Sequence, residues 1–267
     1  MAKIMTEARS EFSDKSKAIK NAINASLEKE KNLLKLMKAD NSGVEYKKLL
    51  LAEEMIYVST LYMSINSLSL KILEVKNNDA LNDARKTIYK AIIYLEEIVS
   101  NAVDCPYSEL EPKIANISNM PIEKRFYLVR KLGLVIRLLV DAFGENSKWK
   151  WSFVELRGRF AAVAKNMIDM KAACKDYFDP RSQDYDNTVL YVRLIRSLLD
   201  KSANEYRDKY ELSSRRIDDM RMGINFLIAN RRIAMILGES DESEEIRKKA
   251  LVWKTKMEND QKSGTSN

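Results

Sequence analysis

The sequence predicts an all-α protein, an elongated multi-helix bundle with two helical lobes and one very long helix toward the C-terminus. Three observations predict this class. The 267 residues include only seven Gly and four Pro, well below the roughly 7% and 5% of average proteins, so turns are few and elements are long. Apolar residues recur at spacings of three and four, as on one face of a helix. Hydrophobic residues make up 45% of the chain, which is enough to bury a core.

Three helices are expected in the first part of the chain. The first spans residues 3–39 and ends in turn residues at 40–43. The second spans 44–76 with an apolar seam at 3-4 spacing, and residues 77–79 supply a break and an N-cap. The third spans about 80–103. We expect these helices to form an N-terminal lobe over residues 1–103.

The segment 104–121 is the clearest boundary in the sequence. It holds three of the four prolines, Pro106, Pro112 and Pro121. Proline inside a helix loses a hydrogen bond and clashes with the preceding turn. We therefore expect a hinge or crossover here, followed by a C-terminal lobe over 122–259 and a flexible tail over 260–267.

The C-terminal lobe begins with a helix that ends at Phe143 and is closed by Gly144. It is apolar almost all round, so it should be the central helix of its lobe. A second helix is expected over about 149–178, stopping before Asp179-Pro180.

The longest expected helix covers residues 187–237, where the 3-4 spacing continues and Gly223 is the single breaker. Such a helix would span roughly 75 Å. Its middle is polar except for a thin seam, which indicates either a coiled-coil-like stalk or a concealed break, with Ser213-Ser214 as the candidate position. A last helix is expected over about 241–258.

Composition excludes several kinds of chemistry. The chain has no histidine, so it lacks an imidazole base, Ser-His-Asp and Cys-His nucleophiles, and histidine metal ligands. Neither glycine-rich phosphate-loop pattern occurs. Asp218 and Asp219 would point about 100° apart on a helix, so they cannot share one ion. We expect no enzymatic activity, no cofactor and no metal site; carboxylate or lysine chemistry stays open, with no residue nominated.

The two cysteines, Cys105 and Cys174, form no CxxC motif and are expected to be reduced thiols, with a single bridge as the alternative. The first residues lack the apolar stretch of a secretory signal, so a cytoplasmic location is expected unless a signal has been removed. The charge-free stretch Met55–Leu70 is too short and too polar for a membrane span.

Charge is distributed unevenly. Between Lys113 and Lys175 there are 13 basic and five acidic residues, a net charge of +8, whereas the whole chain carries +7. This block contains the segment Lys148-Trp149-Lys150-Trp151, followed by Arg157 and Arg159. These six residues are the candidate partner-binding residues.

Basic residues interleaved with aromatic ones can hold a phosphate backbone and stack on bases. They can equally bind an anionic membrane or an acidic protein. The plainer interpretation is a buried helix face, because Trp149, Phe153, Leu156 and Phe160 follow a 4-3-4 spacing, with Trp151 off that stripe.

These observations predict a non-enzymatic α-helical interaction or scaffold protein, a structural or accessory component of a larger assembly such as a filament or motility apparatus. The expected partner is an acidic or helical surface of another protein, and a homo-oligomer is left open. The alternative is a basic module that binds nucleic acid or an anionic lipid surface through residues 113–175.

Overall fold

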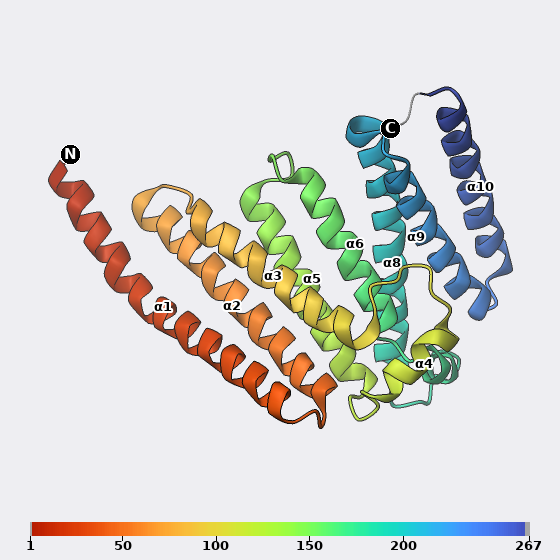
Figure 1. Ribbon diagram of the computed structural model, residues 1–267, viewed down its shortest axis with the longest axis horizontal. Helices are drawn as coiled ribbons and strands as arrows, with labels where there is room; N and C mark the ends of the chain where they lie inside the picture. Colours follow the sequence, from red (N-terminus) through yellow and green to blue (C-terminus); the bar gives the residue numbers. More distant parts are fainter. Residues whose placement is uncertain (1, 265–267) are drawn as a thin grey trace. The chain divides into compact units, whose positions relative to one another are not determined.

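The computed structural model describes residues 2–264. Within them the chain forms ten α-helices, one π-helical turn and no strand, which confirms the all-α multi-helix bundle (Figure 1). The elements are α1 (Ala2–Ala39), α2 (Val44–Leu73), α3 (Asn78–Val99), α4 (Tyr107–Ala115), α5 (Ile122–Phe143), α6 (Lys150–Asn166), α7 (Met170–Tyr177), α8 (Tyr185–Lys209), η1 (Tyr210–Ser214), α9 (Ile217–Ile236) and α10 (Ser240–Lys262).

The chain divides into two compact units. Unit 1 comprises the chain up to Ile98 together with Leu128–Ser147, and unit 2 comprises Val99–Tyr127 together with the chain from Lys148 onward. The expected division differs, because it assigned all of 122–259 to the C-terminal lobe, whereas most of α5 groups with the N-terminal helices. An apolar helix can fill the core of either neighbour, so its sequence does not choose between them.

Unit 1 is built on α2, α3 and the larger part of α5. Their inward faces supply the core, and α1 packs along α2. The carboxylate of Glu30 on α1 is buried, and it accepts hydrogen bonds from the Lys90 Nζ at 2.8 Å and the Tyr94 hydroxyl at 2.6 Å, both on α3. Burial and this hydrogen bond raise the pKa of Tyr94 above its usual range. The buried residues of this core include Leu51, Met55, Val58, Leu81, Ile88, Ile92, Leu95, Leu132, Val135 and Leu139.

Unit 2 is built outward from α6. This helix packs on α8, α8 packs on α9, and α9 packs on α10. Two glycines allow close approach. A Cβ on Gly223 of α9 would lie 3.0 Å from the backbone carbonyl oxygen of Ala203, and a Cβ on Gly158 of α6 would lie 2.7 Å from Cε2 of Tyr206.

Gly158→Ala is expected to lower the free energy of unfolding of unit 2 by about 1–2 kcal/mol, because overpacking costs more than the better helix propensity of alanine gains. Tyr206 cannot swing away freely, since it is buried and stacks on Phe226 with ring centroids 5.6 Å apart. Urea unfolding followed by tryptophan fluorescence measures this, because all three tryptophans lie in unit 2. In a Tyr206→Leu background the same substitution should cost little; an equal cost in both backgrounds would contradict this explanation.

The prediction of a single helix over 187–237 is wrong. Helix α8 ends at Lys209, a π-helical turn follows, and α9 starts at Ile217 and packs back on α8. The break includes Ser213-Ser214, the alternative position, and Arg215 has a left-handed backbone with φ 52°. The apolar spacing runs through the turn because Tyr210 and Met220 are buried on either side of it.

Three further segments differ from expectation or add detail to it. The helix expected over 149–178 stops at Asn166, and α7 begins after Asp169, whose side chain accepts hydrogen bonds from the amides of Lys171 and Ala172. The segment 104–121 contains the short helix α4, with Pro112 inside it. The tail expected from residue 260 is helical to Lys262, and residues 265–267 lie outside the described part.

Candidate interaction site

Four of the six candidate residues lie at the start of α6. Lys148 and Lys150 are exposed, and Trp149 and Trp151 are half-buried. Each lysine lies over the ring of the tryptophan that follows it, with Nζ to ring-centroid distances of 5.5 Å for Lys148 and 5.0 Å for Lys150. These cation–π contacts occupy one side of each ring and leave both ammonium groups in solvent.

The other two candidates are already engaged. The Arg157 Nε donates to Glu205 Oε2 of α8 at 2.8 Å, and both side chains are largely covered. Arg159 is half-buried and has a partner within the chain. Phe153, Leu156 and Phe160 are fully buried, as the plainer interpretation of the stripe expects. The structure therefore separates a surface group at residues 148–151 from a packed group further along α6.

Helices α6 and α8 run antiparallel. The Tyr191 hydroxyl donates to the Ala164 carbonyl at 2.9 Å, whereas Gly158 lies against Tyr206. From Gly158, the chain reaches Lys150 eight residues earlier in α6, a helix rise of roughly 12 Å. From Tyr206, the chain reaches Leu212 six residues later, a rise of roughly 9 Å in the same direction. The start of α6 and the π-helical turn therefore occupy the same end of unit 2 (Figure 1).

The turn over residues 210–216, called the tip below, is exposed at its apex and fixed at its base. Leu212 is 71% exposed, and Arg215 and Arg216 are also exposed. At the base, the buried Asp219 accepts hydrogen bonds from the Lys209 Nζ at 2.8 Å and the Ser214 Oγ at 2.6 Å.

A second anchor connects the tip to α10. The buried Tyr210 hydroxyl donates to Asp260 Oδ2 at 2.7 Å. Burial and this bond raise the pKa of Tyr210 to about 12, and the same bond lowers the pKa of Asp260. A π-turn and a non-glycine residue in the left-handed region both carry a conformational cost, and such features often mark functional positions.

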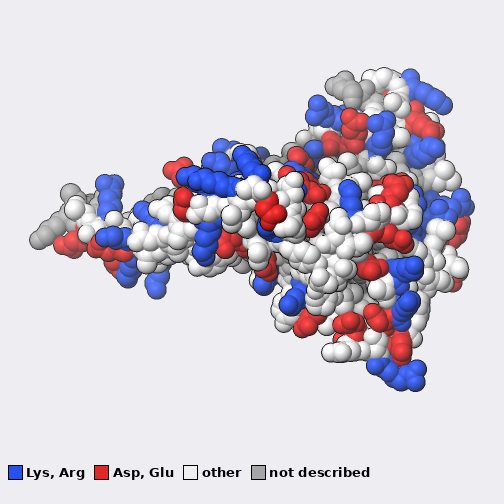
Figure 2. All heavy atoms as spheres, turned by 60° about the horizontal axis from the view of Figure 1, so that its bottom comes forward, with Lys and Arg blue, Asp and Glu red and all other residues white. Residues whose placement is uncertain are grey.

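Four cations at this end, Lys148, Lys150, Arg215 and Arg216, have no carboxylate oxygen within 4 Å in the described part of the chain. Together with Leu212 we call them the basic end. Acidic and basic side chains are interspersed on the face that Figure 2 presents, and the tip itself includes Glu211, which pairs with Arg207. Arg215 and Arg216 were not among the candidate residues, because the sequence placed them within the long helix expected over 187–237, with a break at Ser213-Ser214 only as the alternative.

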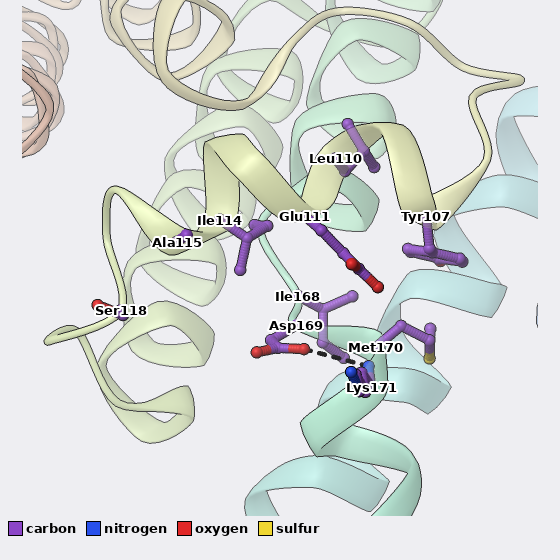
Figure 3. Close-up of a pocket in the computed structure, with 10 residues that line it drawn as sticks. All are labelled: Tyr107, Leu110, Glu111, Ile114, Ala115, Ser118, Ile168, Asp169, Met170 and Lys171. Atoms are coloured by element: carbon purple, nitrogen blue, oxygen red, sulfur yellow. Dashed lines mark hydrogen bonds between the residues drawn. The ribbon is translucent and has the colours of Figure 1, made fainter.

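A pocket of about 310 Å³ lies between α4 and α7 (Figure 3). Its buried wall is apolar, and Glu111, Asp169 and Lys171 stand at its rim. Figure 3 shows Glu111 reaching from α4 toward the start of α7. No sequence signal marked this pocket, because its wall comes from two short helices that the sequence did not predict. The apolar residues of the wall are Tyr107, Leu110, Ile114, Ala115, Ile168 and Met170.

A buried lysine lies deeper in the same unit. Lys165 is 1% exposed, its Nζ donates to the Cys105 carbonyl at 3.4 Å, and it lies 5.1 Å from the Tyr107 ring centroid. Burial lowers the pKa of Lys165 to about 8 and raises the pKa values of the free thiols of Cys105 and Cys174. Both thiols therefore stay protonated near neutral pH, which is the inert state of cysteine.

The residue that follows Lys165 holds the connection to α4. The Asn166 side-chain amide donates to the carbonyls of Ser100 and Ala102 at 2.9 and 3.0 Å. Ser100 has φ 102°, a strained value for a residue with a side chain. The contacts of Lys165 and Asn166 therefore stabilise an otherwise unfavourable backbone path, which is a structural role.

Among residues 2–264, no group of three or more acidic or cysteine side chains is placed to hold a metal ion. None of the helices in that range has both the length and the apolar character that crossing a membrane requires.

Residues 8–261 match the model of the TP0443 family. No curated protein matches the chain, and no solved structure matches it. Because the matched range takes in nearly the whole of both units, the chain belongs to the TP0443 family.

Proposed function

We propose that this chain is a non-enzymatic α-helical interaction protein that works as a component of a larger protein assembly and binds an acidic protein surface through the basic end of unit 2. The proposal rests on the combination of exposed cations with an exposed apolar side chain at the basic end. Lys148, Lys150, Arg215 and Arg216 lie at the same end of unit 2 as Leu212, which is 71% exposed on an anchored turn, and none of the four has a carboxylate oxygen within 4 Å among the described residues. Exposed apolar side chains among unpaired charges are typical of interfaces rather than of inert surface.

The rigidity of the tip favours a docking role. Asp219 and Tyr210 fix the tip from inside the unit, so little conformational entropy is lost when a partner binds. The basic side chains would attract an acidic partner and speed its association, and Leu212 would supply apolar contact at the centre.

Nucleic acid and anionic lipid are the alternative partners. The cations support both, but base stacking needs open aromatic faces. Lys148 and Lys150 each cover one side of a tryptophan ring, and both rings are half-buried. These contacts favour the protein partner.

The test is affinity purification of the tagged chain from its native organism, comparing the wild type with the double variant Lys148→Glu and Lys150→Glu. The wild type should retain an acidic protein that the double variant loses, and binding should weaken from low to high salt. Lys248→Glu, an exposed reversal on α10, is the matched control and should retain the partner. If the double variant retains the same proteins as the wild type, the basic end is not the docking surface; tight retention of nucleic acid or anionic vesicles alone would support the alternative.

A further inference from the structure

Unit 2 carries two surfaces of complementary shape and charge at opposite ends. The tip follows the C-terminal end of α8, and the α4–α7 pocket is formed next to Ile168–Lys171, before α8 begins. The 25 residues of α8 separate these positions by roughly 37 Å. Figure 1 shows the start of α7 and the tip at the two ends of α8.

The tip presents an apolar group that can enter a pocket. Leu212 has the highest exposed fraction among the large apolar side chains of the described residues. The π-turn raises it above a base that is hydrogen-bonded on two sides. Arg215 and Arg216 follow directly, and both are exposed. Neither has a carboxylate oxygen within 4 Å among residues 2–264, although Arg215 lies within electrostatic range of Asp260.

The pocket offers the matching environment. Leu110, Ile114, Ile168 and Met170 are each 6% exposed or less and form its apolar floor. A volume of about 310 Å³ admits a leucine side chain, since a cavity of roughly 150 Å³ is enough for a benzene molecule.

Charge at the rim complements the tip. The Glu111 carboxylate is exposed and has no cation within 4 Å in the described residues. Asp169 uses one oxygen to cap α7, and its second oxygen accepts no hydrogen bond from residues 2–264. Lys171 is the single cation of the rim, so two carboxylates stand against one ammonium group.

We propose that the occupant of the α4–α7 pocket is the tip of a second copy of this chain. Leu212 of one copy enters the pocket of the next, and Arg215 and Arg216 pair with Glu111 and Asp169 at its rim. This contact rests on the interaction role proposed above, and it adds a second copy of the chain as a partner of the tip, beside the acidic protein.

Because the tip and the pocket lie at opposite ends of unit 2, the proposed contact can repeat from copy to copy. The tip cannot reach the pocket of its own copy, because α8 holds the two apart. A contact between two different surfaces is heterologous, and repeated without ring closure it yields linear chains of copies. Burial of one leucine with two arginine–carboxylate pairs gives a weak, salt-sensitive association.

The test uses two variants that each disable one surface. Leu212→Asp disables the tip and Glu111→Arg disables the pocket; both positions are exposed, so folding should be retained, which circular dichroism checks. In sedimentation velocity the wild type should grow in mass up to about 100 μM, whereas each variant alone should associate at least about tenfold more weakly. Leu251→Asp, on the exposed face of α10, is the matched control and should associate like the wild type.

The deciding measurement mixes the two variants. The Glu111→Arg chain keeps a working tip and the Leu212→Asp chain keeps a working pocket, so the mixture should form 1:1 dimers and nothing longer. A wild type that stays monomeric, a mixture that does not dimerise, or a Glu111→Arg chain that associates normally would each overturn the head-to-tail contact. The proposed function fails separately, when charge reversal at Lys148 and Lys150 leaves the retained proteins unchanged.

Discussion

Arg125→Met is expected to lower the free energy of unfolding of unit 2 by about 3 kcal/mol or more. Arg125 at the start of α5 is 4% exposed, and its guanidinium donates to three backbone carbonyls at 2.8–3.0 Å. These are the carbonyls of Ile117, Met120 and Met167. One side chain thus joins the segment after α4 to the end of α6, and methionine fills a similar volume but donates no hydrogen bond.

Urea unfolding followed by tryptophan fluorescence measures this loss in unit 2. Arg125→Lys should fall between the wild type and the methionine variant, because one ammonium group cannot replace a planar five-donor fork. Lys124→Met, at an exposed position of the same helix within unit 2, is the control and should change stability by less than about 0.5 kcal/mol. A methionine variant at position 125 that is as stable as the control would show that these carbonyls do not depend on the guanidinium.

The second large expected effect is a pH dependence of the free energy of unfolding that is caused by Lys165. Burial lowers its pKa from 10.5 to about 8. Between pH 8 and pH 10.5 the unfolded chain therefore binds more protons at this position than the folded chain. Stability rises with pH wherever the unfolded state binds more protons. The contribution of Lys165 to the free energy of unfolding should therefore increase by about 3 kcal/mol across this interval.

Lys165→Met removes the titrating group. The free energies of unfolding of the two proteins should be compared at pH 7, 8.5 and 10 under reducing conditions. The advantage of the methionine variant should be largest at pH 7 and shrink steadily as the pH rises. The thiols of Cys105 and Cys174 have raised pKa values, so folded protein loses stability above about pH 9. Because Cys105 and Lys165 interact electrostatically, both proteins should carry Cys105→Ala, so that the remaining effect of Cys174 is common to them and cancels in the difference. Parallel pH curves would contradict the assignment to Lys165.

Helix α6 shows which features of burial the sequence predicts and which it does not. The 4-3-4 spacing of Trp149, Phe153, Leu156 and Phe160 predicts a buried face, and the last three are buried. Trp149 is half-buried, and it is the N-cap residue, just before the first turn of α6. Spacing predicts which residues share a face, but not how far along the helix a neighbour covers that face.

The candidate site shows the same limit. Lys148 and Lys150 were visible in the sequence as basic residues among aromatic ones, and both are exposed. Their neighbours at the basic end come from a turn more than 60 residues later in the chain. A break at Ser213-Ser214 was only the alternative in the sequence, because the apolar repeat continues through Tyr210 and because the left-handed residue of the turn is Arg215 rather than glycine.

The sequence by itself determined the all-α class, since scarce turn residues and 3-4 apolar spacing are local properties that act within one helix at a time. Tertiary structure alone decided that residues 187–237 fold back as two helices, that most of α5 joins unit 1, and that the α4–α7 pocket exists. The physical reason is that these outcomes depend on which apolar faces bury one another. That choice is made by contacts between residues far apart in the chain, which no local pattern records.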